Sequence, residues 1–173
     1  MRFRIAHLKD ALGIARVHVE SWQTTYKRIL PASFLEQLSL ERRKKLWEDN
    51  ISANNTVIVA ETSDQEIIGF TSGGKEHTEK YPDYKGELYA IYILKEFQGL
   101  GVGKNLMQLL AQDLSKLGYP SMLTWVLDKN NAYDFYKQLD GDIIAQKSID
   151  IAGVTLNESA FGWKNLQQFV IDA

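Results

Sequence analysis

The spacing of apolar side chains changes several times along the chain and predicts an alternation of strands and helices. Residues 2–8 alternate loosely between apolar and polar, as a strand does, and apolar residues then recur at helical spacing to about Tyr26. Pro31 interrupts this helix, and the S-x-x-E pattern of residues 33–36 has the form of a capping box that opens a second helical stretch. We expect this stretch to continue in one or two pieces through RRKKLWEDNI, whose basic side chains indicate a solvated face.

From residue 56 the period shortens to that of strands. The runs 56–61 and 66–73 are separated by a turn-prone segment and are typical of an antiparallel pair. Segment 77–85 has no periodicity and predicts a mobile loop. The apolar run 86–94 predicts a further strand, which leads directly into a turn rich in glycine.

The C-terminal half contains a predicted helix over residues 105–118, with Leu106, Leu110, Leu114 and Leu117 on one face. The remaining pattern predicts a strand at 121–127, a short helix at 132–139, and a closing hairpin of 142–150 and 154–163. The order β-α-α-β-β-β-α-β-α-β-β predicts a mixed α/β fold of the α+β kind. Its mostly antiparallel, twisted sheet has about seven strands and is flanked by about four helices.

Composition limits the class of protein. With 173 residues, a mass of 19.7 kDa and 45% hydrophobic residues, the chain predicts one domain over residues 1–173. A net charge of −2 without a basic block argues against a nucleic acid as partner. The absence of cysteine, and of any spaced cluster of His and carboxylates, argues against a metal site. No apolar run approaches the ~18 residues of a membrane span, so we expect a cytoplasmic protein with no membrane partner.

The segment QGLGVGK, residues 98–104, carries the first chemical signal. Glycines at the start of a helix expose backbone N–H groups without obstruction by a Cβ, and the helix dipole adds partial positive charge, so the turn suits a phosphate. A P-loop needs one more residue between Gly99 and Gly103, and Asn105 stands where Ser or Thr would hold magnesium. A dinucleotide fingerprint needs G-x-G-x-x-G in an early βαβ unit, so the NAD interpretation is weak as well.

The pattern Q-G-x-G-x-G-K after an apolar strand resembles the pyrophosphate loop of the GNAT superfamily of acyl-CoA-dependent N-acetyltransferases, which reads Q/R-x-x-G-x-G/A. Residues 132–139 resemble the A-x-x-F-Y-x-x-L helix of the same superfamily. Two departures are Lys95, which replaces a common proline, and loop 128–131, which is one residue shorter than usual. The resemblance covers nearly the whole chain and implies the GNAT fold in a single N-acetyltransferase domain.

By this resemblance the cofactor is acetyl-CoA. The strand before the glycine turn would contact pantetheine through its backbone, and the turn would wrap the pyrophosphate. An N–H near Ile93 would donate to the oxyanion formed when an amine attacks the thioester. The cofactor-binding residues implied are Ile91, Tyr92, Ile93, Gln98, Gly99, Leu100, Gly101, Val102, Gly103, Lys104, and one or both of Asn130 and Asn131.

Two residues are candidates for catalysis. Tyr136 occupies the family position that protonates the departing CoA thiolate, although it could simply pack beside Phe135. Glu87, at the start of the cofactor strand, could deprotonate the amine through water, or be an ordinary glutamate at a strand end. Simple alternation would place Glu87 on the same face as Tyr89 and Ile91. Of the histidines, His18 is expected in the core, and His7 and His77 have no constellation around them.

The acceptor is less well defined by the sequence. Trp22 and Tyr26 could form an aromatic wall for an amine or could pack in the core. The S-W-x-T-T-Y segment and residues 160–166 look like a bacterial branch of the superfamily whose acceptors are mostly unassigned.

The expected activity is transfer of an acetyl group from acetyl-CoA to the primary amine of a small molecule, such as a polyamine, amino sugar, amino acid or antibiotic. The alternatives are acetylation of a protein N-terminus or lysine, a non-catalytic acyl-CoA-binding module, and a nucleotide-binding regulator, against which the failed P-loop spacing argues. The resemblance is also compatible with a homodimer formed through the edge of the closing hairpin.

Overall fold

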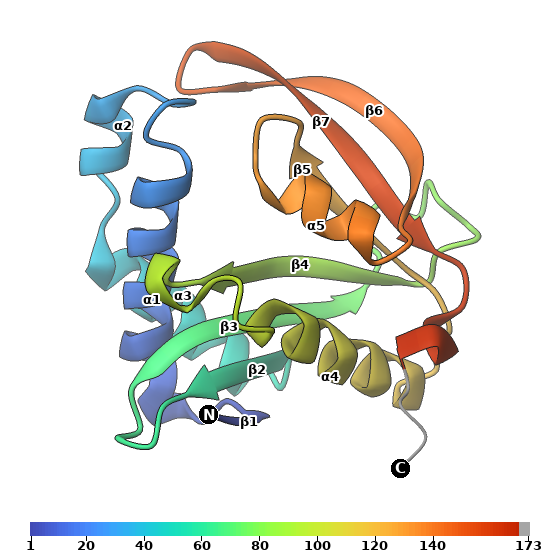
Figure 1. The fold of residues 1–173 in the computed structure, drawn as a ribbon, viewed down its shortest axis with the longest axis horizontal. Helices are drawn as coiled ribbons and strands as arrows, with labels where there is room; N and C mark the ends of the chain where they lie inside the picture. Colours follow the sequence, from blue (N-terminus) through green and yellow to red (C-terminus); the bar gives the residue numbers. More distant parts are fainter. Residues whose placement is uncertain (170–173) are drawn as a thin grey trace.

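The computed structural model describes residues 1–169 and contains a seven-stranded sheet in the order β1-β2-β3-β4-β5-β7-β6 (Figure 1). The strands are β1 (Arg2–Ile5), β2 (Thr56–Glu61), β3 (Ile67–Lys75), β4 (Gly86–Ile93), β5 (Met122–Leu127), β6 (Asp142–Ile151) and β7 (Val154–Trp163). Within residues 1–169, only β4 and β5 pair in parallel, and every other neighbouring pair is antiparallel. The predicted α/β class, element order and mostly antiparallel sheet are confirmed.

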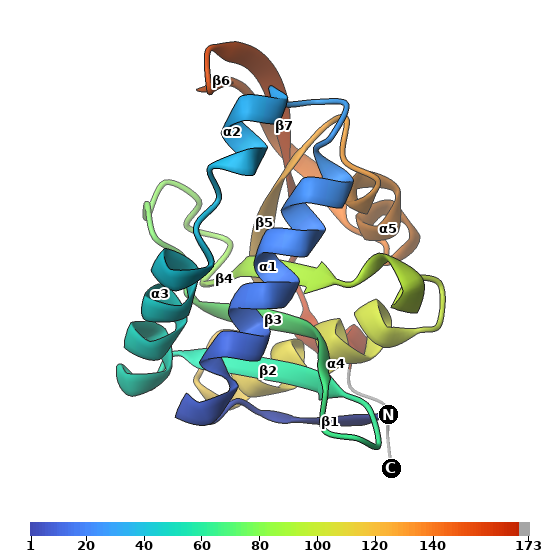
Figure 2. The same ribbon diagram turned by 90° about the vertical axis from the view of Figure 1, so that its left-hand side faces the viewer.

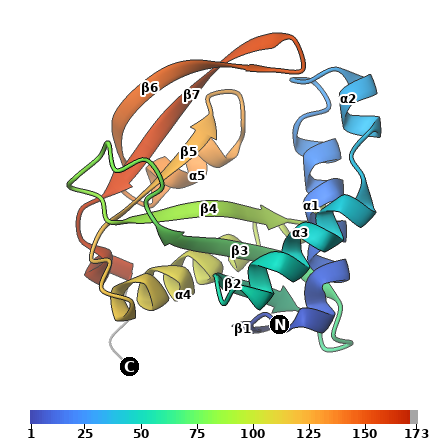
Figure 3. The ribbon, with the colours of Figure 1, turned by 180° about the vertical axis from the view of Figure 1, so that it is seen from behind.

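The helices are α1 (Ala11–Thr25), α2 (Ala32–Glu36), α3 (Leu40–Ser52), α4 (Val102–Lys116) and α5 (Ala132–Gln138), with 3₁₀ turns at Leu8–Asp10, Lys95–Phe97 and Leu166–Phe169. Helices α1 and α3 cover one face of β2, β3 and β4, and α4 covers the opposite face (Figures 1 and 3). The second helical stretch thus forms in two pieces, α2 and α3.

The predicted capping box at residues 33–36 is wrong, because Ser33 lies inside α2. The N-cap is Pro31, whose carbonyl accepts from the backbone N–H of Phe34 at 3.1 Å and of Leu35 at 3.2 Å. A serine does cap the next helix, α3, where the Ser39 hydroxyl accepts from the Arg42 N–H at 3.2 Å. Proline fits the N-cap here because its φ of −58° suits its ring.

The apolar face of α4 packs on the sheet largely as predicted. Leu106, Leu110 and Leu114 are fully buried in the main core. Leu117, expected on the same face, is instead 58% exposed. Because α4 ends at Lys116 and Gly118 takes a left-handed φ of 87°, Leu117 falls in the terminal turn rather than on the buried helix face.

The sheet divides between β4 and β5, and this division positions the site. The two strands pair only at Gly86 with Met122 and Glu87 with Leu123, after which they diverge (Figure 1). Just beyond the paired residues, the Thr124 hydroxyl donates to the Leu88 carbonyl at 3.0 Å. The result is a wedge-shaped gap between β4 and β5 that opens toward α1 and the start of α5.

A second apolar cluster joins the two halves of the molecule at the open end of this gap. It brings the end of α1 and α2 together with β5 and the β6–β7 hairpin, as Figure 2 shows for α2 and the hairpin. The buried members are Tyr26, Leu30, Leu35, Leu127 and Leu156.

Candidate active site

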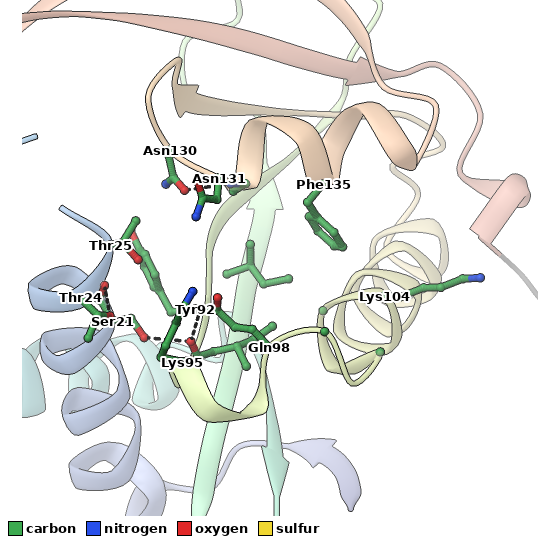
Figure 4. A pocket seen from close by; sticks show the side chains of 16 residues that line it. Ser21, Thr24, Thr25, Tyr92, Lys95, Gln98, Lys104, Asn130, Asn131 and Phe135 are labelled. Carbon is green, nitrogen blue, oxygen red and sulfur yellow. Dashed lines mark hydrogen bonds between the residues drawn. The ribbon is translucent and has the colours of Figure 1, made fainter. Parts of the chain in front are cut away.

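A cavity of about 480 Å³ lies where the end of α1, the C-terminal half of β4, the glycine turn and the start of α5 meet (Figure 4). It is lined by Ser21, Thr24, Thr25, Ile91, Tyr92, Ile93, Lys95, Gln98, Gly99, Gly101, Gly103, Lys104, Asn130, Asn131, Ala132 and Phe135. Most of the residues that the sequence assigns to cofactor binding are therefore neighbours in space.

The glycine turn presents unpaired backbone donors to this cavity. Gly99 and Gly101 adopt left-handed φ values of 76° and 79°, and a Cβ at Gly99 would have no heavy atom within 4 Å. The first hydrogen bond inside α4 runs from the Asn105 N–H to the Gly101 carbonyl, at 3.1 Å. The N–H groups of residues 101–104 consequently have no partner within the helix, and no side chain caps it. Open space beside free donors at a helix start suits an anion.

The exposed edge of β4 forms the opposite wall of the cavity. The Leu94 N–H donates to the Ile68 carbonyl of the neighbouring strand at 2.9 Å. Because backbone groups alternate in direction along an antiparallel strand, those of Ile91 and Ile93 point away from β3 and into the gap. The Ile93 carbonyl accepts from Gln98 Nε2 at 3.0 Å and from Ser21 Oγ at 3.4 Å, so Gln98 anchors the glycine turn to β4.

Three predicted cofactor residues place their side chains elsewhere. Leu100 is 61% exposed and Val102 is 1% exposed, and neither lines the cavity. Leu100 extends outward from the turn, whereas Val102 packs in the core. Lys104 lines the cavity, yet its side chain points away from the other labelled groups (Figure 4). Any contact from Leu100 and Val102 is therefore restricted to their backbone.

Both asparagines of loop 128–131 line the cavity, but they differ in their partners. Asn130 donates from Nδ2 to the Tyr26 hydroxyl at 2.9 Å and accepts at Oδ1 from the Ala132 N–H at 2.9 Å. Asn131 is the N-cap of α5 and makes no side-chain capping bond. Asn130 thus shapes the loop, whereas the Asn131 side chain is not used in capping α5.

Tyr136 is buried at the gap between β4 and β5. Its ring packs against Phe161 and Trp163, with centroid distances of 5.7 and 5.8 Å. Burial raises the pKa of the Tyr136 phenol, and a hydrogen bond with the Thr124 side chain opposes this shift. Since Thr124 bonds to β4 across the gap, the Tyr136 hydroxyl lies beside that gap and stays protonated at neutral pH.

Simple alternation is right to place Glu87 on the face of Tyr89, whose ring a Cβ on Gly74, the partner of Glu87, would contact; it is wrong for Ile91, because β4 contains a bulge. Gly73 of β3 pairs with Leu88 and Ser72 pairs with Ala90, which leaves Tyr89 without a partner. A Cβ on Gly86 would contact Leu114 of α4, and Ile93 contacts Gly103 of α4, so positions 86 and 93 share a face despite their odd separation. Glu87 therefore faces away from α4, opposite to Ile91 and Ile93.

The expectation that His77 has no constellation around it is also wrong. The His77 Nδ1 atom lies 2.9 Å from Glu87 Oε2, and the His77 backbone N–H donates to the same oxygen at 3.1 Å. The rings of His77 and Tyr89 lie 4.3 Å apart. No spacing in the sequence signals this cluster, because loop 77–85 carries His77 back to the strand that holds Glu87.

Comparison with known proteins agrees with this geometry. The profile of the Acetyltransferase (GNAT) family matches residues 17–140. The chain belongs to the GNAT family. It is 37% identical to the N-acetyltransferase YuaI of Bacillus subtilis (strain 168) over 163 residues, covering 94% of this chain and 92% of YuaI. As a member of this family, the chain is an N-acetyltransferase, an enzyme of the acyltransferase class.

Solved structures of GNAT proteins share its fold. The structure of yncA from Salmonella typhimurium, which contains its cofactor acetyl-CoA, has a TM-score of 0.70 at 18% identity and covers 96% of this chain and 94% of that one. The PaiA N-acetyltransferase of Thermoplasma acidophilum, in complex with coenzyme A, has a TM-score of 0.68 at 20% identity, with coverages of 92% and 98%.

The aromatic residues proposed for the acceptor lie beside the cavity lining, since the Tyr26 hydroxyl accepts from Asn130 Nδ2 at 2.9 Å and Asn130 lines the cavity. Tyr26 is 6% exposed, belongs to the second apolar cluster, and has a pKa raised by burial. Trp22 is partly buried, with its ring 4.8 Å from that of Tyr26 and the Arg43 guanidinium 5.9 Å above it. Neither lines the cavity, and an acceptor role for Trp22 and Tyr26 stays a prediction.

His18 occupies the core as predicted. It is 7% exposed, and its Nδ1 accepts from Trp47 Nε1 at 3.2 Å. Burial, assisted by the charge of Arg43, lowers the pKa of His18 to about 3, so the ring is neutral. Its ring stacks on that of Tyr92 at 5.0 Å.

Sequence reasoning missed the polar residues of α1 that line the cavity. Ser21, Thr24 and Thr25 recur at helical spacing, and this polar stripe was the available signal. Lys95 and Phe135 also line the cavity without having been assigned to it. Within residues 1–169, no group of three or more acidic, His or Cys residues is arranged to hold a metal ion. No helix in that range is long and apolar enough to cross a membrane.

Proposed function

We propose that this enzyme transfers an acetyl group from acetyl-CoA to the primary amine of a small molecule. One observation carries the proposal: the unpaired N–H groups of residues 101–104 and the outward backbone of Ile91 and Ile93 meet in one cavity. An anion site beside an open strand edge suits a ligand with a pyrophosphate at one end and an extended amide-bearing arm at the other. Acyl-CoA has this shape.

The residues present fit such a ligand. The space beside Gly99 and Gly101 would be filled by any larger side chain, and the four free N–H groups give a pyrophosphate its donors. The backbone of Ile91 and Ile93 would pair with the amides of the pantetheine arm, and Asn131 would add a side-chain amide. Bound acetyl-CoA supplies the acetyl group as a thioester.

Two residues of the chain would handle protons on either side of the gap. The Tyr136 phenol, kept protonated by burial, would donate to the leaving sulfur. Glu87, on the face of β4 opposite to Ile91 and Ile93, would assist the removal of the proton that the acceptor nitrogen loses. The Ile93 N–H, which points into the gap, would stabilise the carbonyl oxygen during attack.

The second apolar cluster supports a small acceptor. Leu30 and Leu35 pack with Leu156 of the β6–β7 hairpin, so the α1–α2 connection and the hairpin meet over the open end of the gap. An extended protein segment needs an open groove there. We therefore favour a free amine over a protein N-terminus or a lysine side chain as the acceptor.

The test has two stages. Isothermal titration of the purified protein with acetyl-CoA should show one site per chain. A free-thiol assay should then show turnover with at least one of spermidine, glucosamine, lysine methyl ester and kanamycin, and none with a peptide bearing a free N-terminus and an internal lysine. Turnover on the peptide alone would overturn the small-molecule assignment, and no acetyl-CoA binding would overturn the proposed function.

A further inference from the structure

The pair formed by His77 and Glu87 lies on the face of β4 that points away from α4, because Glu87 lies on the opposite face from Ile91 and Ile93. Figure 3 shows the loop that joins β3 and β4. The Glu87 side chain is 14% exposed and that of His77 is 63% exposed. The Glu87 Oε2 atom is occupied twice by residue 77, at 2.9 Å from its ring and at 3.1 Å from its backbone. An amine approaching from solvent therefore meets the imidazole before the carboxylate.

Contact with Glu87 also determines which ring nitrogen of His77 is free. An ionised carboxylate only accepts hydrogen bonds, so Nδ1 must carry the proton that is shared with Glu87 Oε2. The neutral ring then presents the lone pair of Nε2 outward. A carboxylate that orients one nitrogen of a histidine leaves the other nitrogen ready to take a proton.

The loop around His77 is fixed by a second, buried carboxylate. Glu76 is 4% exposed and accepts from the Thr78 N–H at 2.8 Å, the Thr78 hydroxyl at 2.6 Å and the Glu79 N–H at 2.5 Å. The Tyr89 hydroxyl donates to the Lys75 carbonyl at 2.6 Å, which holds the Tyr89 ring beside His77. The other charged groups nearby, Lys75 and Glu79, pair with each other at 2.5 Å. His77 is thus held in place rather than free on a loose loop.

We propose that His77 is the proton acceptor for the amine, and that Glu87 orients its ring and stabilises the imidazolium. This inference rests on the proposed function. The N–H bond of the acceptor ammonium breaks as an Nε2–H bond forms on His77, which leaves a neutral amine to attack the thioester. As the C–N bond forms and the C–S bond breaks, Tyr136 protonates the sulfur, and the second proton released by the nitrogen returns to the Tyr136 phenolate. The exposed ring then returns the proton to water. Glu87 keeps its negative charge throughout, so no proton is lost or gained by the pair over a cycle.

Substitutions separate this role from a structural one. His77→Gln can still donate to Glu87 but cannot take a proton, so we expect turnover on the best amine of the panel to fall by about 100-fold, as in His77→Ala. Acetyl-CoA affinity should be unchanged in both variants. Added imidazole should partly restore His77→Ala. Lys80→Ala, an exposed change in the same loop, should behave as wild type. Full activity of His77→Gln would show that His77 only positions Glu87, and would overturn the proposal while leaving the transferase intact.

The tautomer offers a test that needs no acceptor. In long-range ¹H–¹⁵N spectra at about pH 8, His77 should carry its proton on Nδ1, and His77→Gln assigns the signal. His18 is an internal reference with the opposite tautomer, because its Nδ1 accepts from Trp47 and its proton is on Nε2. In Glu87→Gln, whose amide can donate, His77 should shift toward the Nε2–H form. A His77 proton on Nε2 in the wild type would overturn the proposal.

Discussion

The two faces of β4 differ in the chemical groups that they present: one presents backbone groups and the other presents side chains. The side toward α4 offers backbone groups, namely the free N–H groups at the glycine turn and the outward edge at Ile91 and Ile93. The opposite face is built from side chains, with the His77–Glu87 pair near one end and His18 stacked on Tyr92 near the other. A backbone site tolerates many side chains but few changes of glycine, whereas a side-chain site depends on each residue. The faces should therefore respond to different substitutions.

The largest effect is expected at the backbone face. Gly101→Asp puts a side chain on a residue with φ of 79° and directs a carboxylate toward the free N–H groups. We expect the Kd for acetyl-CoA to rise by at least ~100-fold, about 2.7 kcal/mol. Calorimetry measures it, with a thermal melt to verify folding. Leu100→Ala, an exposed neighbour off the cavity, is the matched control and should bind normally. A folded Gly101→Asp protein with normal affinity contradicts the backbone site.

The next effect tests the residue at the gap itself. Tyr136→Phe keeps the packing against Phe161 and Trp163 and removes only the hydroxyl. We expect turnover to fall by about 100-fold with acetyl-CoA affinity retained, since the hydroxyl acts on the leaving sulfur. Steady-state kinetics and calorimetry on the same preparation give both values. Unchanged turnover would leave Tyr136 as a packing residue alone.

A smaller effect is expected from the aromatic side chains of α1. If Trp22 borders the acceptor, Trp22→Leu should raise the KM for the amine by about 10-fold, about 1.4 kcal/mol, and leave the KM for acetyl-CoA unchanged. Thr24→Ala changes a residue that lines the cavity on the same helix. It should raise the KM for acetyl-CoA by a smaller factor and leave the KM for the amine unchanged. Equal changes in both KM values for Trp22→Leu would mean that Trp22 only supports the core.

The last effect concerns stability rather than activity and should arise on the side-chain face. Because burial lowers the pKa of His18 to about 3, folding favours its neutral ring. Above the pKa of about 6.5 that His18 has in the unfolded chain, the ring is neutral in both states and its contribution to stability is fully present. As the pH falls below 6.5, only the unfolded state takes up a proton, so the free energy of unfolding drops by about 1.4 kcal/mol per pH unit. His18→Gln keeps an acceptor for Trp47 without titrating, so urea unfolding from pH 7 to 5 should show a shallower decline. Parallel declines would contradict a buried neutral His18.

The backbone site at the glycine turn could be predicted from the sequence, whereas the side-chain pair of His77 and Glu87 could not. Gly99, Gly101 and Gln98 lie within one short segment, and their roles depend on local backbone geometry that spacing specifies. His77 and Glu87 meet through a loop of irregular conformation, and the bulge at Tyr89 reverses the face of Glu87 relative to that of Ile91. Neither the loop path nor the bulge has a periodic signal. The capping box predicted at Ser33 is wrong because the helix starts earlier, with Pro31 as its N-cap, so Ser33 lies inside α2.

The measurement that tests the central claim most directly is a titration of ¹⁵N-labelled protein with acetyl-CoA, followed through its backbone amides. The largest shifts are predicted at Gly99, at residues 101–104, and at Ile91 and Ile93, with small shifts at His77 and Glu87 on the opposite face of β4. If the amides of the glycine turn stay unmoved while acetyl-CoA binds elsewhere, the backbone site described for this cavity is contradicted.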